Sequence, residues 1–136
     1  MADPKRTHRQ VLRFALGLPG AYEDHPWDEI VAKVNRKVFV FFGAPESPHW
    51  PGMTVKLLES HQAALGIPGA EPTGYGLGKS GWVNLTFRGD GIPPAAVLTD
   101  WVEESYRLVA PKQLIAELDA RARSAPTSKP LKEASP

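Results

Sequence analysis

The glycine-rich stretch from Gly74 to Phe87 constrains the fold more than any other part of the chain. It reads GYGLGKSGWVNLTF, and its last six residues alternate as a half-buried strand does. Gly78-Lys79-Ser80 matches the end of a phosphate-binding loop. Such a loop also needs a glycine five residues before Gly78, where this chain has Thr73, and it must open a helix. The stretch therefore predicts a turn into a central strand, with Lys79 exposed where the strand begins.

Length and composition predict a single domain without cysteine. A chain of 136 residues with 42% hydrophobic residues is long enough to bury a core. The absence of cysteine excludes disulfides, thiolate metal sites and cysteine nucleophiles. No apolar run suits a signal peptide or a transmembrane helix, so we expect a cytoplasmic protein that binds no membrane.

Charge is distributed unevenly along the chain, although the net charge is only +1. Residues 1–13 and 121–136 each carry four basic residues and one acidic residue, whereas residues 14–120 hold 8 basic and 13 acidic residues. A mildly acidic body does not attract nucleic acid as a whole. Any contact with phosphates must therefore come from local patches and from the termini.

Apolar periodicity predicts an α+β domain over residues 1–123. Helices are expected at residues 5–17, at 59–65, from Pro93-Pro94 to residue 109, and from residue 111 onward. Strands are expected at residues 29–34, 37–42, 53–57 and 82–88, with Asn35-Arg36 as a two-residue hairpin turn. The order α-β-β-β-α-β-α-α favours an antiparallel sheet with helices packed on one face. Residues 124–136, rich in Ser, Pro, Lys and Ala, are predicted to form a disordered tail.

Five short segments follow one another in an order typical of one family. They are Leu18-Pro19-Gly20 with Glu23 and His25-Pro26-Trp27; Val34-Asn35-Arg36-Lys37-Val38-Phe39; Val55-Lys56-Leu57; Gly74-Tyr75 with Lys79 and Trp82; and Ser105-Tyr106-Arg107-Leu108-Val109. Together they resemble the MmcQ/YjbR family over roughly residues 8–120. The resemblance implies a YjbR-like fold, similar to the secretion-chaperone-like and CyaY-like domains.

Members of the MmcQ/YjbR family are described as DNA-binding proteins with a double-wing arrangement of β-elements. The resemblance therefore implies duplex DNA as a partner. This chain departs from the family at two turns. It has Asn35-Arg36 where the family often has a glycine, and Gly78-Lys79-Ser80-Gly81 where relatives often carry a cluster of the Lys-Arg-His type.

Basic residues near the predicted strand ends are the candidate nucleic-acid contacts. They are Lys33, Arg36, Lys37, Lys56 and Lys79. The first three are expected at one hairpin tip and the other two at other strand ends, and phosphate binding requires them to share a face. The alternative is a solvated sheet edge, where lysine discourages pairing between sheets.

The four tryptophans are the candidates for stacking on bases or for lining a pocket. Trp101 lies on the apolar stripe of a predicted helix and is expected in the core. Trp50, in a proline-rich loop, is the best candidate for an exposed ring, whereas Trp27 and Trp82 are expected to anchor a loop and the sheet. Trp50 and Trp82 are the candidates for stacking on a base or for lining a pocket.

No residue pattern is typical of a catalytic or metal site. Glu23, Asp24 and His25 are adjacent in a loop and cannot all converge on one ion, so we expect His25 to cap or bridge loop backbone. His8, His49 and His61 lack the spacing of metal ligands. We expect no catalytic residues, no metal and no cofactor.

Three hypotheses about function remain open. The first is a non-enzymatic DNA-binding protein of the MmcQ/YjbR family with weak, phosphate-dominated contacts, which predicts strongly salt-dependent binding. The second is a protein-interaction or chaperone-like module with a protein partner, which predicts an exposed apolar sheet face or a dimer. The third is a small-ligand binder with residues 43–52 as a lid, which predicts a closed pocket beside Trp50 and Trp82.

Overall fold

The computed structural model describes residues 3–48, 50–74, 77–87 and 91–124 and has the α+β architecture expected from the sequence. The helices are α1 (Pro4–Leu16), α2 (His61–Leu65), α3 (Ala95–Val109) and α4 (Lys112–Ser124). The strands are β1 (Tyr22–Asp24), β2 (Ile30–Val34), β3 (Lys37–Gly43), β4 (Gly52–Lys56), β5 (Ala70–Pro72) and β6 (Trp82–Thr86). Two short 3₁₀ turns, η1 (Pro26–Asp28) and η2 (Leu77–Ser80), precede β2 and β6.

The strands form one six-stranded antiparallel sheet in the order β1-β2-β3-β4-β6-β5. The two edge strands, β1 and β5, were not predicted, and β1 lies in a segment expected to be a loop. Each has three residues, which is too short to carry a periodic signal. They are strands because they pair with longer neighbours, β1 with β2 and β5 with β6.

The hairpin between β2 and β3 confirms the predicted two-residue turn. Asn35 and Arg36 both have positive φ, 52° and 67°, as a tight turn of this hand requires. The pairing register then shifts, so that Ala32 lies opposite Val40 and Lys33 lies opposite Val38. This bulge turns both Phe39 and Val40 toward the core, and strict alternation does not predict that.

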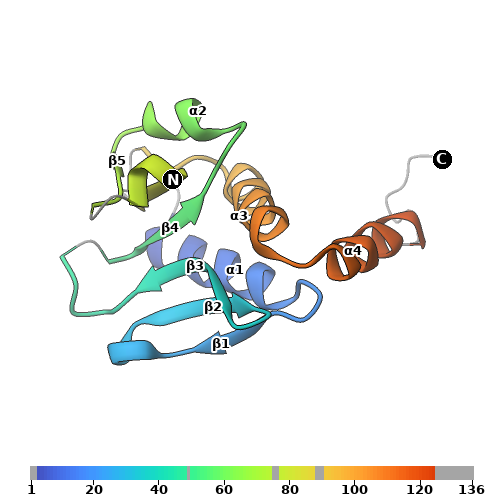
Figure 1. The fold of residues 1–136 in the computed structure, drawn as a ribbon. Coiled ribbons are helices and arrows are strands. Elements are labelled where there is room, and N and C mark those ends of the chain that lie inside the picture. Colours follow the sequence, from blue (N-terminus) through green and yellow to red (C-terminus); the bar gives the residue numbers. More distant parts are fainter. Residues whose placement is uncertain (1–2, 49, 75–76, 88–90, 125–136) are drawn as a thin grey trace.

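Helices α1 and α3 cover one face of the sheet (Figure 1). Val40, Val55 and Val83 lie side by side on that face in β3, β4 and β6, and all three are fully buried. Val11 of α1 and Leu98 of α3 belong to the same core. Trp101 of α3 is 7% exposed, which confirms its predicted place in the core.

Ser105 ties α3 to the centre of the sheet. Its Oγ donates a 2.6 Å hydrogen bond to the carbonyl oxygen of Phe39 and accepts a 2.9 Å bond from the backbone N–H of Lys56. The residue is fully buried, so neither backbone group has a ready substitute partner. A buried serine thus joins β3 and β4 next to the bulge.

Two predictions about tryptophan were wrong. Trp27, expected to anchor its loop, is 94% exposed, since the 3₁₀ turn holds it at φ 52° with its ring outside the core. Trp50, expected on the surface, is half-buried, because its ring packs on His8 of α1 with 4.2 Å between ring centroids. The contact partner of Trp50 lies 42 positions away in the chain, beyond the reach of local composition.

Helix α4 extends from the end of α3 (Figure 1) and packs on the same core through Leu114, Ile115 and Leu118. Arg121 donates a 2.8 Å hydrogen bond to the carbonyl oxygen of Gly17 at the end of α1. The predicted tail begins at the last residue of α4, and residues 125–136 lie outside the described part of the chain. Within the described ranges, none of the helices has the length and apolar character needed to cross a membrane.

Candidate nucleic-acid interface

The strand register brings four of the predicted basic residues to one end of the sheet. Val40 of β3 pairs with Val55 of β4, and Lys56 pairs with Trp82 of β6. The hairpin turn, the last residue of β4 and the first residue of β6 therefore lie at the same end. We call this region the basic end; it consists of Arg36, Lys37, Lys56 and Lys79.

The side chains of the basic end are accessible. Arg36, Lys37 and Lys79 are exposed, and Lys56 is half-buried. Among the ion pairs of the described residues, none involves a member of the basic end. These charges are available to an external anion.

Lys33, the fifth predicted contact, is already paired. Its Nζ lies 3.1 Å from Oδ2 of Asp24 in the neighbouring strand β1. The pKa of Asp24 is lowered by the hydrogen bond from the backbone N–H of His25 and then by Lys33. A phosphate would therefore have to compete with the carboxylate of Asp24 for the ammonium group of Lys33.

The glycine turn before β6 fixes the position of Lys79. Gly81 has φ +99°, and a Cβ on it would lie 2.5 Å from the carbonyl oxygen of Leu57. The backbone N–H of Leu57 donates a 2.9 Å hydrogen bond to the carbonyl of Gly81, which closes the turn onto the end of β4. Because η2 leads into a strand, the turn is not a phosphate-binding loop.

A small hollow of about 220 Å³ lies beside Lys79. Ser80, His61 and Leu58 also line it. The Nε2 atom of His61 is buried and has no hydrogen-bond partner in the described part of the chain. The proximity of His61 to Lys79 depends on the closed glycine turn and therefore has no signal in the sequence.

The face of the sheet opposite α1 and α3, here called the outer face, carries a second hollow of about 620 Å³. Its lining includes Trp27, Phe41, Thr54, Asn84 and Leu77. Gly43 and Ser47, from the predicted lid, lie at its rim. The hollow is open, and neither Trp50 nor Trp82 lines it, so it is not the closed pocket that the lid hypothesis predicts. Trp82 lies next to it, 5.4 Å from Phe41 between ring centroids.

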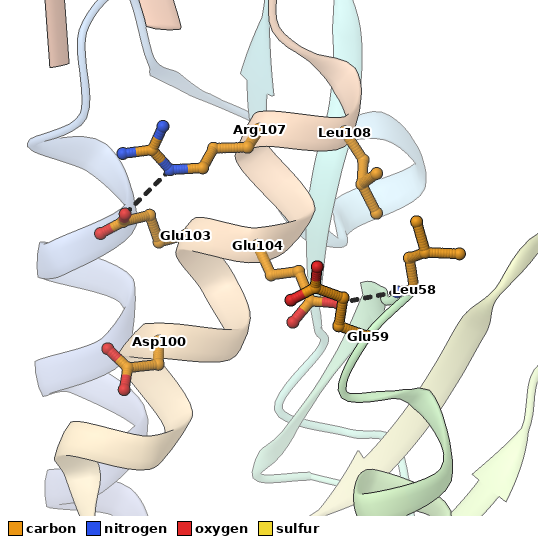
Figure 2. Close-up of a pocket in the computed structure, with 7 residues that line it drawn as sticks. All are labelled: Leu58, Glu59, Asp100, Glu103, Glu104, Arg107 and Leu108. Atoms are coloured by element: carbon orange, nitrogen blue, oxygen red, sulfur yellow. Dashed lines mark hydrogen bonds and ion pairs between the residues drawn. The ribbon is translucent and has the colours of Figure 1, made fainter. Parts of the chain in front are cut away.

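An acidic groove of about 380 Å³ lies between α3 and the segment after β4 (Figure 2). Its lining residues are Leu58, Glu59, Asp100, Glu103, Glu104, Arg107 and Leu108. Leu58 is 71% exposed at one wall, and Leu108 lies across from it. Four carboxylates against one guanidinium give the groove a negative charge.

Two of the charged groups in the acidic groove are held by specific bonds. Arg107 donates to Glu103 at 2.9 Å and to Asp119 of α4 at 2.8 Å, and the bond to Asp119 raises the pKa of Arg107. Glu104 accepts from the backbone N–H groups of Leu58 and Ser60, at 2.7 and 3.2 Å. Burial alone would raise the pKa of Glu104, but these bonds and one from the Ser60 side chain lower it overall.

Helix α1 carries a second basic surface, which lies outside the predicted nucleic-acid contacts. Arg6, Arg9 and Arg13 are exposed and, with Gln10, line a hollow of about 340 Å³ on this helix. Their spacing of three and four residues places them on one helical face. The same spacing is visible in the sequence, where these residues were counted only as N-terminal charge.

Within the described ranges, no group of three or more histidine, cysteine or carboxylate side chains is arranged to hold a metal. His25 forms a 2.6 Å bond from Nε2 to Oε2 of Glu23, and its backbone N–H donates to Asp24. The imidazole thus pairs with a carboxylate rather than with loop backbone, which differs from the prediction. Both partners are well exposed, so the pair contributes little to stability.

These features define an α+β domain with an antiparallel sheet, helices on one face and a basic end. The family model named YjbR matches residues 16–108, and the chain belongs to the YjbR family. The match contains the whole basic end and the outer face. No curated protein matches the chain.

Proposed function

We propose that this protein binds DNA without catalysing a reaction and that the basic end contacts the phosphate backbone. The observation that carries the proposal is the strand register, which gathers Arg36, Lys37, Lys56 and Lys79 at one end of the sheet. Membership of the YjbR family supports it. Lys33 contributes less, because Asp24 already neutralises it.

The direction of approach follows from the neighbouring charges. Leu58 lines both the acidic groove and the hollow beside Lys79, so the two regions are adjacent. Phosphates are repelled by the carboxylates of α3 and attracted by the basic end. DNA therefore approaches the basic end from the side of the outer face, away from α3.

The expected affinity is modest and depends on salt. Each phosphate contact on duplex DNA contributes about −0.9 to the slope of log affinity against log salt. Four contacts give a slope of about −3.6. Such binding is not sequence-specific, and its dissociation constant at physiological salt is about 10⁻⁴ to 10⁻⁶ M.

The test is a salt titration of duplex-DNA binding, followed by fluorescence anisotropy. The double variant Arg36→Gln/Lys37→Gln should flatten the slope by about two. Arg9→Gln/Arg13→Gln on α1 is the matched control, because it removes the same charge from a different surface. If only the α1 variant has a flatter slope, the phosphate contacts lie on α1 and not at the basic end. Absence of binding by the wild type at low salt would overturn the proposal.

The acidic groove favours a second candidate function, a protein-interaction module. Exposed Leu58 and Leu108 beside four carboxylates suit a partner segment with apolar and basic side chains. A titration with a short Lys/Leu-containing peptide tests this candidate. Asp100→Asn should weaken peptide binding and should not weaken DNA binding. If the affinity for the peptide is unchanged in this variant, the peptide does not bind in the acidic groove.

A further inference from the structure

Aromatic side chains cross the outer face from the basic end toward the opposite end of the sheet. Trp82 pairs with Lys56 at the basic end, and Phe41 contacts Trp82 with 5.4 Å between ring centroids. Trp27 lies beyond Phe41 in η1, at the end of the sheet where Ile30 pairs with Gly43. Phe41 and Trp27 both line the 620 Å³ hollow.

The hollow has the size of a site for a planar heterocycle, and an exposed indole is among the side chains that line it. Trp27 is 94% exposed, which is unusual for the largest apolar side chain. Trp27 and Asp28 are both held at positive φ, 52° and 64°, a conformation that non-glycine residues seldom adopt. Strain of this kind is concentrated at ligand sites.

The side-chain amide of Asn84, which lines the hollow, has its orientation fixed by hydrogen bonds. The side-chain oxygen of Asn84 accepts from the hydroxyls of Thr54 and Thr73, at 2.8 and 2.7 Å. These two bonds set the orientation of the amide, so its NH₂ group remains to donate elsewhere. A ligand over Asn84 should therefore present a carbonyl oxygen or a ring nitrogen, as the edges of the nucleobases do.

We propose that the outer face is a stacking platform for the unpaired bases of single-stranded DNA, with phosphates bound at the basic end. The proposal rests on the proposed function and deepens it. Duplex bases are stacked on one another and cannot lie on a sheet, whereas unpaired bases stack on aromatic rings in a sequence-tolerant way. The four-stranded sheets of some RNA-binding domains stack about two or three bases.

The charge distribution favours DNA over an uncharged occupant. The aromatic platform is continuous with the basic end through the pair Lys56 and Trp82. A strand lying along β6 therefore places its bases on rings and its phosphates near cations. Glu29 is the carboxylate lining the hollow among the described residues, at the end far from the basic end, while Glu71 of β5, opposite Asn84, is exposed on the same face outside the hollow.

The first experiment compares a labelled oligothymidylate with a duplex of equal length in fluorescence anisotropy. The wild type should bind the single strand more tightly. Trp27→Ala should weaken single-strand binding by about 5- to 150-fold, the range for loss of one stacked base, and leave duplex binding unchanged. Trp27→Phe should restore part of the loss. Leu108→Ala, which truncates an exposed side chain on α3, is the matched control.

A second experiment separates failure of the platform from failure of the proposed function. Uncharged adenosine makes no phosphate contact, so quenching of tryptophan fluorescence by adenosine reports stacking alone. Quenching that disappears in Trp27→Ala supports the platform even if the basic end does not bind DNA. If Trp27→Ala changes neither adenosine quenching nor single-strand binding, the platform proposal is wrong. If duplex binding is retained in that case, the proposed function still holds.

Discussion

The hydroxyl of Tyr106 donates a 2.6 Å hydrogen bond to the backbone carbonyl of Pro19, 87 positions earlier in the chain. The side chain is fully buried in α3, and its ring meets Phe39 edge-to-face with 5.3 Å between centroids. Burial raises the pKa of Tyr106, and the nearby carboxylate of Glu117 raises it further. The hydroxyl therefore stays protonated and serves as the donor that ties the loop after α1 to α3.

Replacing Tyr106 by Phe should lower the free energy of unfolding by about 1–3 kcal/mol, because the buried carbonyl of Pro19 loses its partner. Urea unfolding measures the change. Tyr22→Phe is the control, since Tyr22 is 42% exposed on the edge strand β1. Equal effects in the two variants would mean that the bond to Pro19 contributes nothing to stability.

The stability of the domain should decrease as pH falls below about 6.5, through His8. The imidazole is 3% exposed, and its Nε2 lies 3.1 Å from the carbonyl oxygen of Phe42. Burial lowers the pKa of His8 from 6.5, although the Phe42 carbonyl partly offsets this effect. The unfolded chain therefore takes up a proton at a higher pH than the folded chain does, so acid favours unfolding.

Urea unfolding at neutral pH and at about one unit below the ordinary histidine pKa tests the role of His8. His8→Gln should reduce the difference between the two conditions. The lowered pKa values of Asp24 and Glu104 affect stability only below their ordinary values of 3.8 and 4.5. A pH dependence that persists in His8→Gln would point to a different titrating group.

Local patterns in the sequence were sufficient for the class of fold, since it depends on composition and alternation over short ranges. The β2–β3 hairpin and the core position of Trp101 followed from the same signals. The edge strands β1 and β5 did not, because a three-residue strand is defined by its neighbour. The register that gathers the basic end is likewise a property of paired strands.

The exposure of the tryptophans depended on contacts that no local pattern contains. Trp50 is half-buried because it meets His8 of α1, and Trp27 is exposed because its backbone adopts a positive φ. Neighbouring prolines indicated a loop at Trp50, correctly, but a loop residue is exposed only if no distant element covers it. Trp27 therefore replaces Trp50 as a stacking candidate, and Trp82 remains one.

Truncation of two tryptophans should have very different effects on stability. Trp101→Ala should cost about 3–5 kcal/mol, as truncation of a large buried aromatic residue does. Trp27→Ala should change stability by at most about 0.5 kcal/mol, because the ring is 94% exposed. Thermal unfolding of both variants measures the contrast. A large loss in Trp27→Ala would show that the indole packs against the domain.

Gly81→Ala should destabilise the domain and also weaken DNA binding. The φ of +99° disfavours any side chain at this position, and the added Cβ would lie 2.5 Å from the carbonyl oxygen of Leu57. The strain is worth about 1–3 kcal/mol. Relief requires the turn to move away from the end of β4, and that movement carries Lys79 away from Lys56.

Gly74→Ala is the matched control for Gly81→Ala. Gly74 precedes the same turn, its φ lies outside the glycine-favouring range, and a Cβ on it would have nothing within 4 Å among the described residues. Urea unfolding and duplex-DNA anisotropy at fixed salt are measured on both variants. Lys79→Ala, which removes only the charge, gives the loss expected from a missing contact. If Gly81→Ala destabilises the domain but binds DNA as tightly as Gly74→Ala does, the turn stabilises the sheet and Lys79 is not a phosphate contact.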